Sequence, residues 1–110
     1  MEISVRNVDD VVVLDFSGVW ESKDSAEISR SMSQLVDLGY KKVILNLSDM
    51  GMIPRKSVPL LLSFCRDALK KRCEIKVVAS STQVRSTLRS GGLFGSFGFY
   101  RDETNALKEF

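Results

Sequence analysis

Residues 42–72 read KVILNLSDMGMIPRKSVPLLLSFCRDALKKR, and this stretch decides the fold. Its first six residues form a nearly continuous apolar run, which is typical of a buried strand. After a loop that contains Gly51 and Pro54, apolar residues return at helical spacing from about Ser57 to Lys71. Pro59 suits the first turn of this helix, where its missing N–H costs nothing. The expected apolar stripe of the helix consists of Val58, Leu61, Leu62, Cys65, Ala68 and Leu69.

Two strands and a helix precede this stretch. Ile3 and Val5 alternate with polar residues, and the β-branched run 11–16 follows turn-forming residues at 7–10, so these segments predict a hairpin. Beyond a loop at 18–23, Asp24 and Glu27 have the spacing of a capping box at the start of a helix that ends at Gly39. Because strand 42–47 follows this helix closely, we expect a parallel crossover.

Shorter elements follow the central helix. Residues 75–79 predict a strand, Ser81 opens a short helix that stops at Gly91 and Gly92, residues 97–100 predict an edge strand, and Asp102 caps a terminal helix. The order of elements predicts an α/β fold, in which one domain over residues 1–110 has a four- or five-stranded mixed sheet with about four helices.

The composition excludes several classes of protein. The 110 residues contain no histidine, the commonest general base and metal ligand, and a formal net charge of +2 does not indicate a nucleic-acid partner. Cys65 and Cys73 have no second pair to complete a zinc site, and we expect them to be reduced and structural. No signal peptide and no apolar run of about 20 residues occurs, so we expect a cytoplasmic protein without direct membrane contact.

Four segments carry a resemblance to a known family. After the strand KVILNLS and the loop DMGMI, residues 54–57 (PRKS) stand before the long helix, residues 84–85 (VR) lie on the short helix, 92–93 (GL) follow it, and 18–21 (GVWE) follow the second strand. With these segments the chain resembles the STAS domain of bacterial anti-sigma-factor antagonists over essentially its whole length. The resemblance implies a regulator that binds proteins rather than an enzyme. It also implies a protein partner, such as an anti-sigma factor with a kinase fold.

The chain departs from that family at the motif itself. The family has Asp-Ser-Ser-Gly before the second helix, and its partner kinase phosphorylates a serine there. Here these positions hold Pro54, Arg55, Lys56 and Ser57, and the usual aspartate one strand earlier is Asn46. The usual phosphoacceptor is therefore missing.

Several residues of this region allow two interpretations. Ser57 is either a phosphoacceptor shifted by one residue or a helix N-cap whose Oγ accepts from the Leu60 N–H. Asp49 either replaces a lost carboxylate or bonds its own turn. Trp20 is either an exposed interface anchor or a cover for the end of the sheet. The aromatic residues Phe94, Phe97, Phe99 and Tyr100 either form a sticky surface or close the core.

The sequence thus predicts partner binding without the ordinary phosphoserine switch. The expected partner-binding residues are Trp20, Glu21, Ser22, Lys23, Asp24, Asp49, Pro54, Arg55, Lys56 and Ser57. One alternative is a non-switching scaffold or subunit of a larger regulatory or transport complex. Another is a small module that binds an anion or nucleotide at Arg55 and Lys56. We expect no catalytic residue, metal or cofactor, and at most a weak homodimer.

Overall fold

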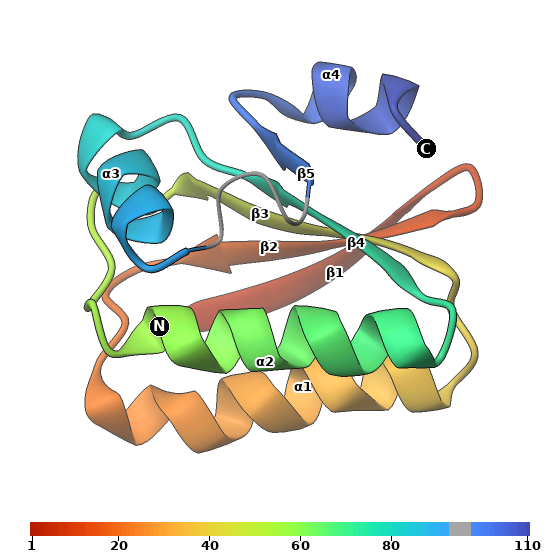
Figure 1. The fold of residues 1–110 in the computed structure, drawn as a ribbon, viewed down its shortest axis with the longest axis horizontal. Coiled ribbons are helices and arrows are strands. Elements are labelled where there is room, and N and C mark those ends of the chain that lie inside the picture. Colours follow the sequence, from red (N-terminus) through yellow and green to blue (C-terminus); the bar gives the residue numbers. More distant parts are fainter. Residues whose placement is uncertain (93–97) are drawn as a thin grey trace.

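Strands and helices alternate after an opening hairpin in the computed structural model, which describes residues 1–92 and 98–110 (Figure 1). The strands of the described part are β1 (Glu2–Val8), β2 (Val11–Ser17), β3 (Lys42–Asp49), β4 (Glu74–Val78) and β5 (Gly98–Tyr100). Its helices are the short 3₁₀ helix η1 (Ser22–Asp24), α1 (Ser25–Asp37), α2 (Ser57–Lys70), α3 (Thr82–Ser90) and α4 (Glu103–Lys108). The predicted α/β order is confirmed.

The sheet is mixed and its strands follow the order β1-β2-β3-β4-β5. The hairpin prediction is confirmed, because β1 pairs antiparallel with β2 around a turn in which Asp9 has a φ of 55°. The other three pairs are parallel, with Leu14 opposite Leu45 and Leu45 opposite Val77. The parallel strands therefore place their carboxyl ends at one edge of the sheet.

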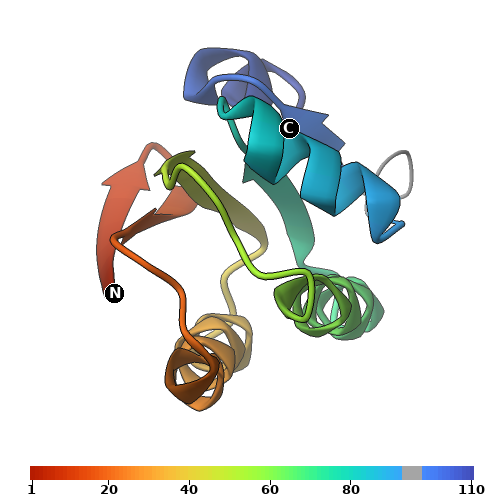
Figure 2. The ribbon, with the colours of Figure 1, turned by 90° about the vertical axis from the view of Figure 1, so that its left-hand side faces the viewer.

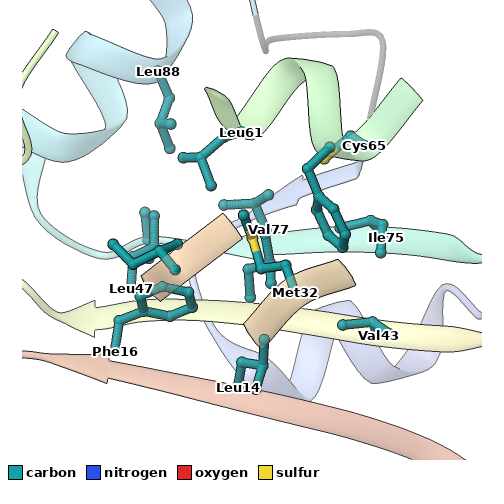
Figure 3. Close-up of a cluster of buried hydrophobic side chains, with 14 of the residues drawn as sticks. Leu14, Phe16, Met32, Val43, Leu47, Leu61, Cys65, Ile75, Val77 and Leu88 are labelled. Carbon is teal, nitrogen blue, oxygen red and sulfur yellow. The ribbon is translucent and has the colours of Figure 1, made fainter. Parts of the chain in front are cut away.

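Helices cover both faces of the sheet (Figures 1 and 2). On one face, side chains of α1, α2 and α3 such as Met32, Leu61 and Leu88 meet apolar residues of β2, β3 and β4 in the larger core (Figure 3). On the other face, Ala106 of α4 packs with Val13 and other strand residues in a smaller core. This two-layer burial explains the continuous apolar runs of β2 and β3, since both faces of these strands are covered.

Two local predictions are wrong. The stripe of α2 includes Phe64, which is buried, whereas Leu69 is 59% exposed, because the buried face of the helix is centred on Leu61, Cys65 and Ala68. The predicted capping box of Asp24 and Glu27 is wrong by one turn, because the observed capping box consists of Glu21 and Asp24. An added 3₁₀ turn precedes α1, and there the Asp24 Oδ2 accepts from the Glu21 N–H at 2.8 Å.

The predicted caps of the last two helices are confirmed. The Ser81 Oγ accepts from the Val84 N–H at 3.4 Å, and the Asp102 Oδ1 accepts from the Asn105 N–H at 2.8 Å. Of the aromatic cluster, Phe99 and Tyr100 pack against the two cores. Phe94, Phe97 and Leu93, with the predicted start of the last strand at 97, lie outside the described residues.

Candidate functional site

The predicted binding residues gather at the carboxyl ends of β2 and β3 (left in Figure 1). Three connections meet at this end of the molecule, namely 18–24 after β2, 50–56 after β3 and 79–81 after β4. The carboxyl edge of a parallel sheet is where α/β proteins bind their ligands, because the loops there are free to vary over a rigid scaffold. The fold thus brings together segments that are spread over residues 18–81 of the sequence.

The loop after β3 is fastened to the rest of the molecule. Met50 and Ile53 point into the core with 1% and 3% exposure. The Ile53 N–H donates to Gln83 Oε1 at 3.2 Å, and the Ser81 Oγ donates to the Gly51 carbonyl at 2.8 Å. Since both partners belong to the start of α3, this helix holds the loop in place. Met52, the residue between these two hydrogen-bonded positions, therefore projects from a backbone that is held in place.

Ser57 does not cap α2 through its side chain. It is the first residue of the helix, Lys56 occupies the N-cap position, and the Ser57 Oγ donates to the Pro54 carbonyl at 2.6 Å. Ser57 is also only 2% exposed. The prediction of a cap bond from Leu60 is wrong. In this conformation the hydroxyl is closed to an incoming kinase.

Arg55 and Lys56 are exposed just before α2. Within the described residues, neither side chain pairs with a carboxylate, and Pro54 beside them is half-buried. A helix N-terminus favours negative charge, so two cations here do not stabilise the helix. Both charges are available to an outside partner.

Trp20 is buried and cannot serve as a surface anchor. Its side chain is 3% exposed, its ring stacks on Phe16 with centroids 6.2 Å apart, and its Nε1 donates to Ser25 Oγ at 3.4 Å. The interpretation as a cover for the end of the sheet is therefore the correct one. Its neighbour Val19 is turned outward instead and is 65% exposed.

Val19 and Met52 are the surface residues that the sequence reasoning missed. Met52 is 64% exposed on the loop after β3. In the sheet β3 is the neighbour of β2, and the loop after β2 carries Val19. Both are apolar residues one position after a glycine, outside any strand or helix period. Neither residue thus has apolar neighbours at strand or helix spacing, and this is the sequence feature that indicates an exposed side chain. We call Val19, Met52, Arg55 and Lys56 together the carboxyl-end surface.

The remaining predicted residues surround this surface. Glu21, Ser22 and Lys23 are exposed, while Asp24 is half-buried in its bond to Glu21. Asp49 is exposed opposite Ser17 in the sheet register. The predicted bond of Asp49 to its own turn is wrong, since the described residues offer its side chain no hydrogen-bond partner.

Asn46, at the position of the usual family aspartate, is part of the scaffold. Its Nδ2 donates to Asp15 Oδ1 at 2.8 Å, and its Oδ1 accepts from the Ser48 N–H at 3.0 Å. Arg6 donates to the same Asp15 and to Glu103 of α4. The hydrogen bonds from Arg6 lower the pKa of the Asp15 carboxyl, and the hydrogen bond from Asn46 adds to this effect. Partial burial of the carboxyl acts in the opposite direction and raises its pKa, but by less. Asn46 supplies a donor to Asp15, whereas an aspartate at this position would face a second carboxylate.

The described residues hold no group of three or more His, Cys, Asp or Glu side chains arranged to bind a metal. Both cysteines are free and buried, and burial raises the pKa of Cys65 to about 12, so this thiol stays protonated at neutral pH. No helix in the described part of the chain has the length and apolar character to span a membrane.

Comparison with known proteins places this geometry in a family. A sequence model described as the STAS domain matches residues 2–106. No curated protein matches the sequence significantly.

Solved structures share the whole fold. An anti-sigma factor antagonist from Mycobacterium paratuberculosis has a TM-score of 0.89 at 19% identity, covering 98% of this chain and 92% of that chain. A variant of RsbS from Moorella thermoacetica has a TM-score of 0.82 at 14% identity, with coverage of 99% and 94%. The Bacillus cell fate determinant SpoIIAA in its phosphorylated form has a TM-score of 0.74 at 18% identity, with coverage of 98% of both chains. At these identities the similarity establishes the fold.

Proposed function

This chain belongs to the STAS domain family, and from that premise we propose that it is a regulator that acts by binding a protein partner, in the manner of an anti-sigma-factor antagonist. The partner is an anti-sigma factor with a kinase-like fold or another regulatory protein of the cytoplasm. The chain contributes a docking surface and no catalytic group. Its solved structural neighbours include anti-sigma factor antagonists, which supports this assignment.

The carboxyl-end surface is the observation that carries the proposal. Two of the five large apolar side chains that are strongly exposed in the described residues, Val19 and Met52, lie on its neighbouring loops. Exposed apolar side chains on loops at one end of a sheet are suited to protein contacts. Arg55 and Lys56 beside them attract and orient an acidic patch on the partner, because complementary charge steers association.

The proposed regulator works without a phosphoserine at the start of α2. The usual acceptor positions hold Arg55 and Lys56, and the nearest hydroxyl, that of Ser57, is buried and bonded to Pro54. A phosphoserine would add nearly two negative charges at this place. Two fixed positive charges create the opposite potential, so the chain remains in one binding state.

Charge reversal at the carboxyl-end surface tests this proposal. With a candidate anti-sigma kinase as partner, the double variant Arg55→Glu/Lys56→Glu should bind at least about tenfold more weakly by calorimetry, a loss of about 1.4 kcal/mol. The double variant Arg66→Glu/Lys70→Glu is the matched control, since it reverses two exposed charges within α2 rather than before its start. Equal affinity of both double variants would exclude this docking surface.

Incubation of the same pair with ATP tests the absence of the switch. Intact mass and phosphosite mapping should show no phosphate on Ser57, and the affinity should not change. Ser57→Ala serves as the control for site assignment. Phosphate on Ser57 together with loss of binding would show that the family switch operates one residue later than usual.

The burial of Ser57 also favours a second candidate function, a permanent subunit of a larger regulatory assembly. Such a subunit holds its partners in fixed stoichiometry, whereas an antagonist exchanges between partners. Size-exclusion chromatography with light scattering distinguishes the two. A complex that resists an excess of free competitor supports the subunit, and rapid exchange supports the antagonist.

A further inference from the structure

Three arginines converge on a cavity whose lining shares no residue with the carboxyl-end surface. The cavity has a volume of about 330 Å³ and is lined by Thr82, Arg85, Ser86, Arg89 and Arg101. The first four residues belong to α3, the crossover helix between β4 and β5, and Arg101 directly follows β5. Because β5 runs parallel to β4, Arg101 also stands at a carboxyl end of the sheet. This is the edge at which parallel sheets present ligand sites.

The lining residues supply hydrogen-bond donors and positive charge. Three guanidinium groups and two hydroxyl groups face one cavity, and none of its described lining residues is acidic. Guanidinium groups match phosphate oxygens in pairs, so such a set is suited to a phosphate-bearing ligand. The cavity is larger than a single phosphate needs and lies at the lower end of the range of small-ligand pockets.

Arg85 gives this cavity a second, independent mark of a binding site. Its Nε is buried and has no acceptor among residues 1–92 and 98–110, whereas buried donors in folded proteins are nearly always paired. Its guanidinium lies over the ring of Phe99, with Cζ 5.7 Å from the ring centroid. This contact holds the guanidinium group in place. Burial, together with the charges of Arg101 and Arg89, lowers the pKa of Arg85. The charged guanidinium of Arg85 is thus held in an unfavourable environment, and a bound anion would remove this energetic cost.

We propose that this arginine pocket binds the phosphate groups of a small phosphorylated ligand, with Arg85, Arg89 and Arg101 as charge partners and the hydroxyls of Thr82 and Ser86 as further donors. The site is separate from Arg55 and Lys56, where the sequence suggested an anion. The proposal does not depend on a protein partner. Its test is therefore independent of the function proposed above.

Titration with inorganic pyrophosphate at constant ionic strength tests the pocket. In ¹⁵N nuclear magnetic resonance spectra, the Arg85 Nε–H and the amides of Thr82 and Ser86 should shift along saturable curves. Arg101→Ala should weaken binding at least about tenfold, because it removes a charged donor at an exposed position that carries no core packing. Arg66→Ala, at an exposed arginine of α2, should leave the affinity unchanged. Arg85→Lys keeps the charge but not the fork, and should fall between them.

Further probes identify the source of the phosphate chemistry. Sulfate at the same ionic strength should bind more weakly than pyrophosphate, while vesicles of phosphatidylglycerol that compete with pyrophosphate would assign the pocket to lipid headgroups. The proposal is overturned if the shifts are linear and spread over all exposed arginines. It is equally overturned if Arg101→Ala and Arg66→Ala bind pyrophosphate as the native chain does.

Discussion

At the scale of single residues, the structure gives Asn46 and Ser57 roles that their sequence positions did not reveal. Both stand where the family resemblance implies functional groups, yet both side chains are engaged inside the molecule, Asn46 with Asp15 and Ser57 with Pro54. The departure from the family motif is therefore built into the scaffold. Restoring the family residue at either position should disturb the fold before it restores a switch.

Asn46→Asp tests this at the residue scale. The new carboxylate would face Asp15 across the 2.8 Å now spanned by a hydrogen bond, and we expect a loss of about 1–2 kcal/mol in the free energy of unfolding at pH 7. The repulsion raises one of the two carboxyl pKa values in the folded state above its unfolded value. The penalty should therefore shrink as the pH falls toward about 4, where that group takes up a proton.

Urea unfolding at pH 7 and pH 4 measures the penalty. Asn7→Asp, on the exposed edge strand β1, is the control and should change stability by less than about 0.5 kcal/mol at either pH. A variant at position 46 that is as stable as the native chain at pH 7 would show that Asp15 does not need a donor there.

At the scale of elements, the contact between α2 and α3 determines how the functional end is built. The start of α3 holds the loop after β3 through Ser81 and Gln83. The end of α3 lies against the start of α2, where a Cβ added to Gly91 would come within 2.2 Å of the Val58 Cγ1. Gly91 has a φ of −84°, so its need for glycine is purely one of space.

Gly91→Ala should cost about 1–3 kcal/mol of stability, because either Val58 or the end of α3 must move. Combining it with Val58→Ala removes the closest contact, that with the Val58 Cγ1, and leaves only the Val58 Cβ at 2.8 Å. The double variant should then be more stable than the sum of the single losses implies, by about 1 kcal/mol or more in a double-mutant cycle of thermal or urea unfolding. Gly51→Ala is the control, since nothing lies within 4 Å of its added Cβ. Additive losses at 91 and 58 would contradict this packing.

The same helix shows what sequence patterns predict and what they leave out. Local chemistry correctly located the Ser81 cap and the stop of α3 at Gly91, since caps and breakers act on their own neighbours in the chain. The contact of Gly91 with Val58 joins residues 33 positions apart, and no local pattern contains it. Trp20 stacks on Phe16, only four positions away, but its burial also depends on core residues from distant elements, which no local pattern contains.

At the scale of the whole molecule, the periodic elements and their order were predictable, while the surface was not. Apolar runs and helical stripes report burial directly, so β2, β3, α1 and most of α2 were recognisable in the sequence. Exposure in loops depends on which side chain the tertiary structure covers. Trp20 and Val19 are adjacent in the chain, yet one is buried and the other is exposed. The arginine pocket joins two elements across the β4–β5 crossover and was likewise outside the reach of the sequence.

The larger core runs from Trp20 at the carboxyl end of the sheet to Cys65 and Cys73 near the end of α2, so it should unfold as one unit. The Cys65 thiol provides a way to test this. Its pKa is raised by burial to about 12 in the folded chain, against about 8.5 for an unfolded thiol. Its contribution to stability is therefore complete below about pH 8.5 and is lost as the pH rises toward 12, at up to about 1.4 kcal/mol per pH unit.

We expect the native chain to lose about 2–3 kcal/mol more stability than Cys65→Ala between pH 8.5 and pH 10.5, whatever the starting difference between them. Urea unfolding followed in parallel by circular dichroism and by the fluorescence of Trp20 measures this. Because both probes report the same core, their midpoints should coincide at each pH and move together. A Trp20 transition that stays fixed while the helical signal shifts would show that the two ends of the core unfold separately, and parallel pH profiles for the two proteins would show that the Cys65 thiol ionises without unfolding the chain.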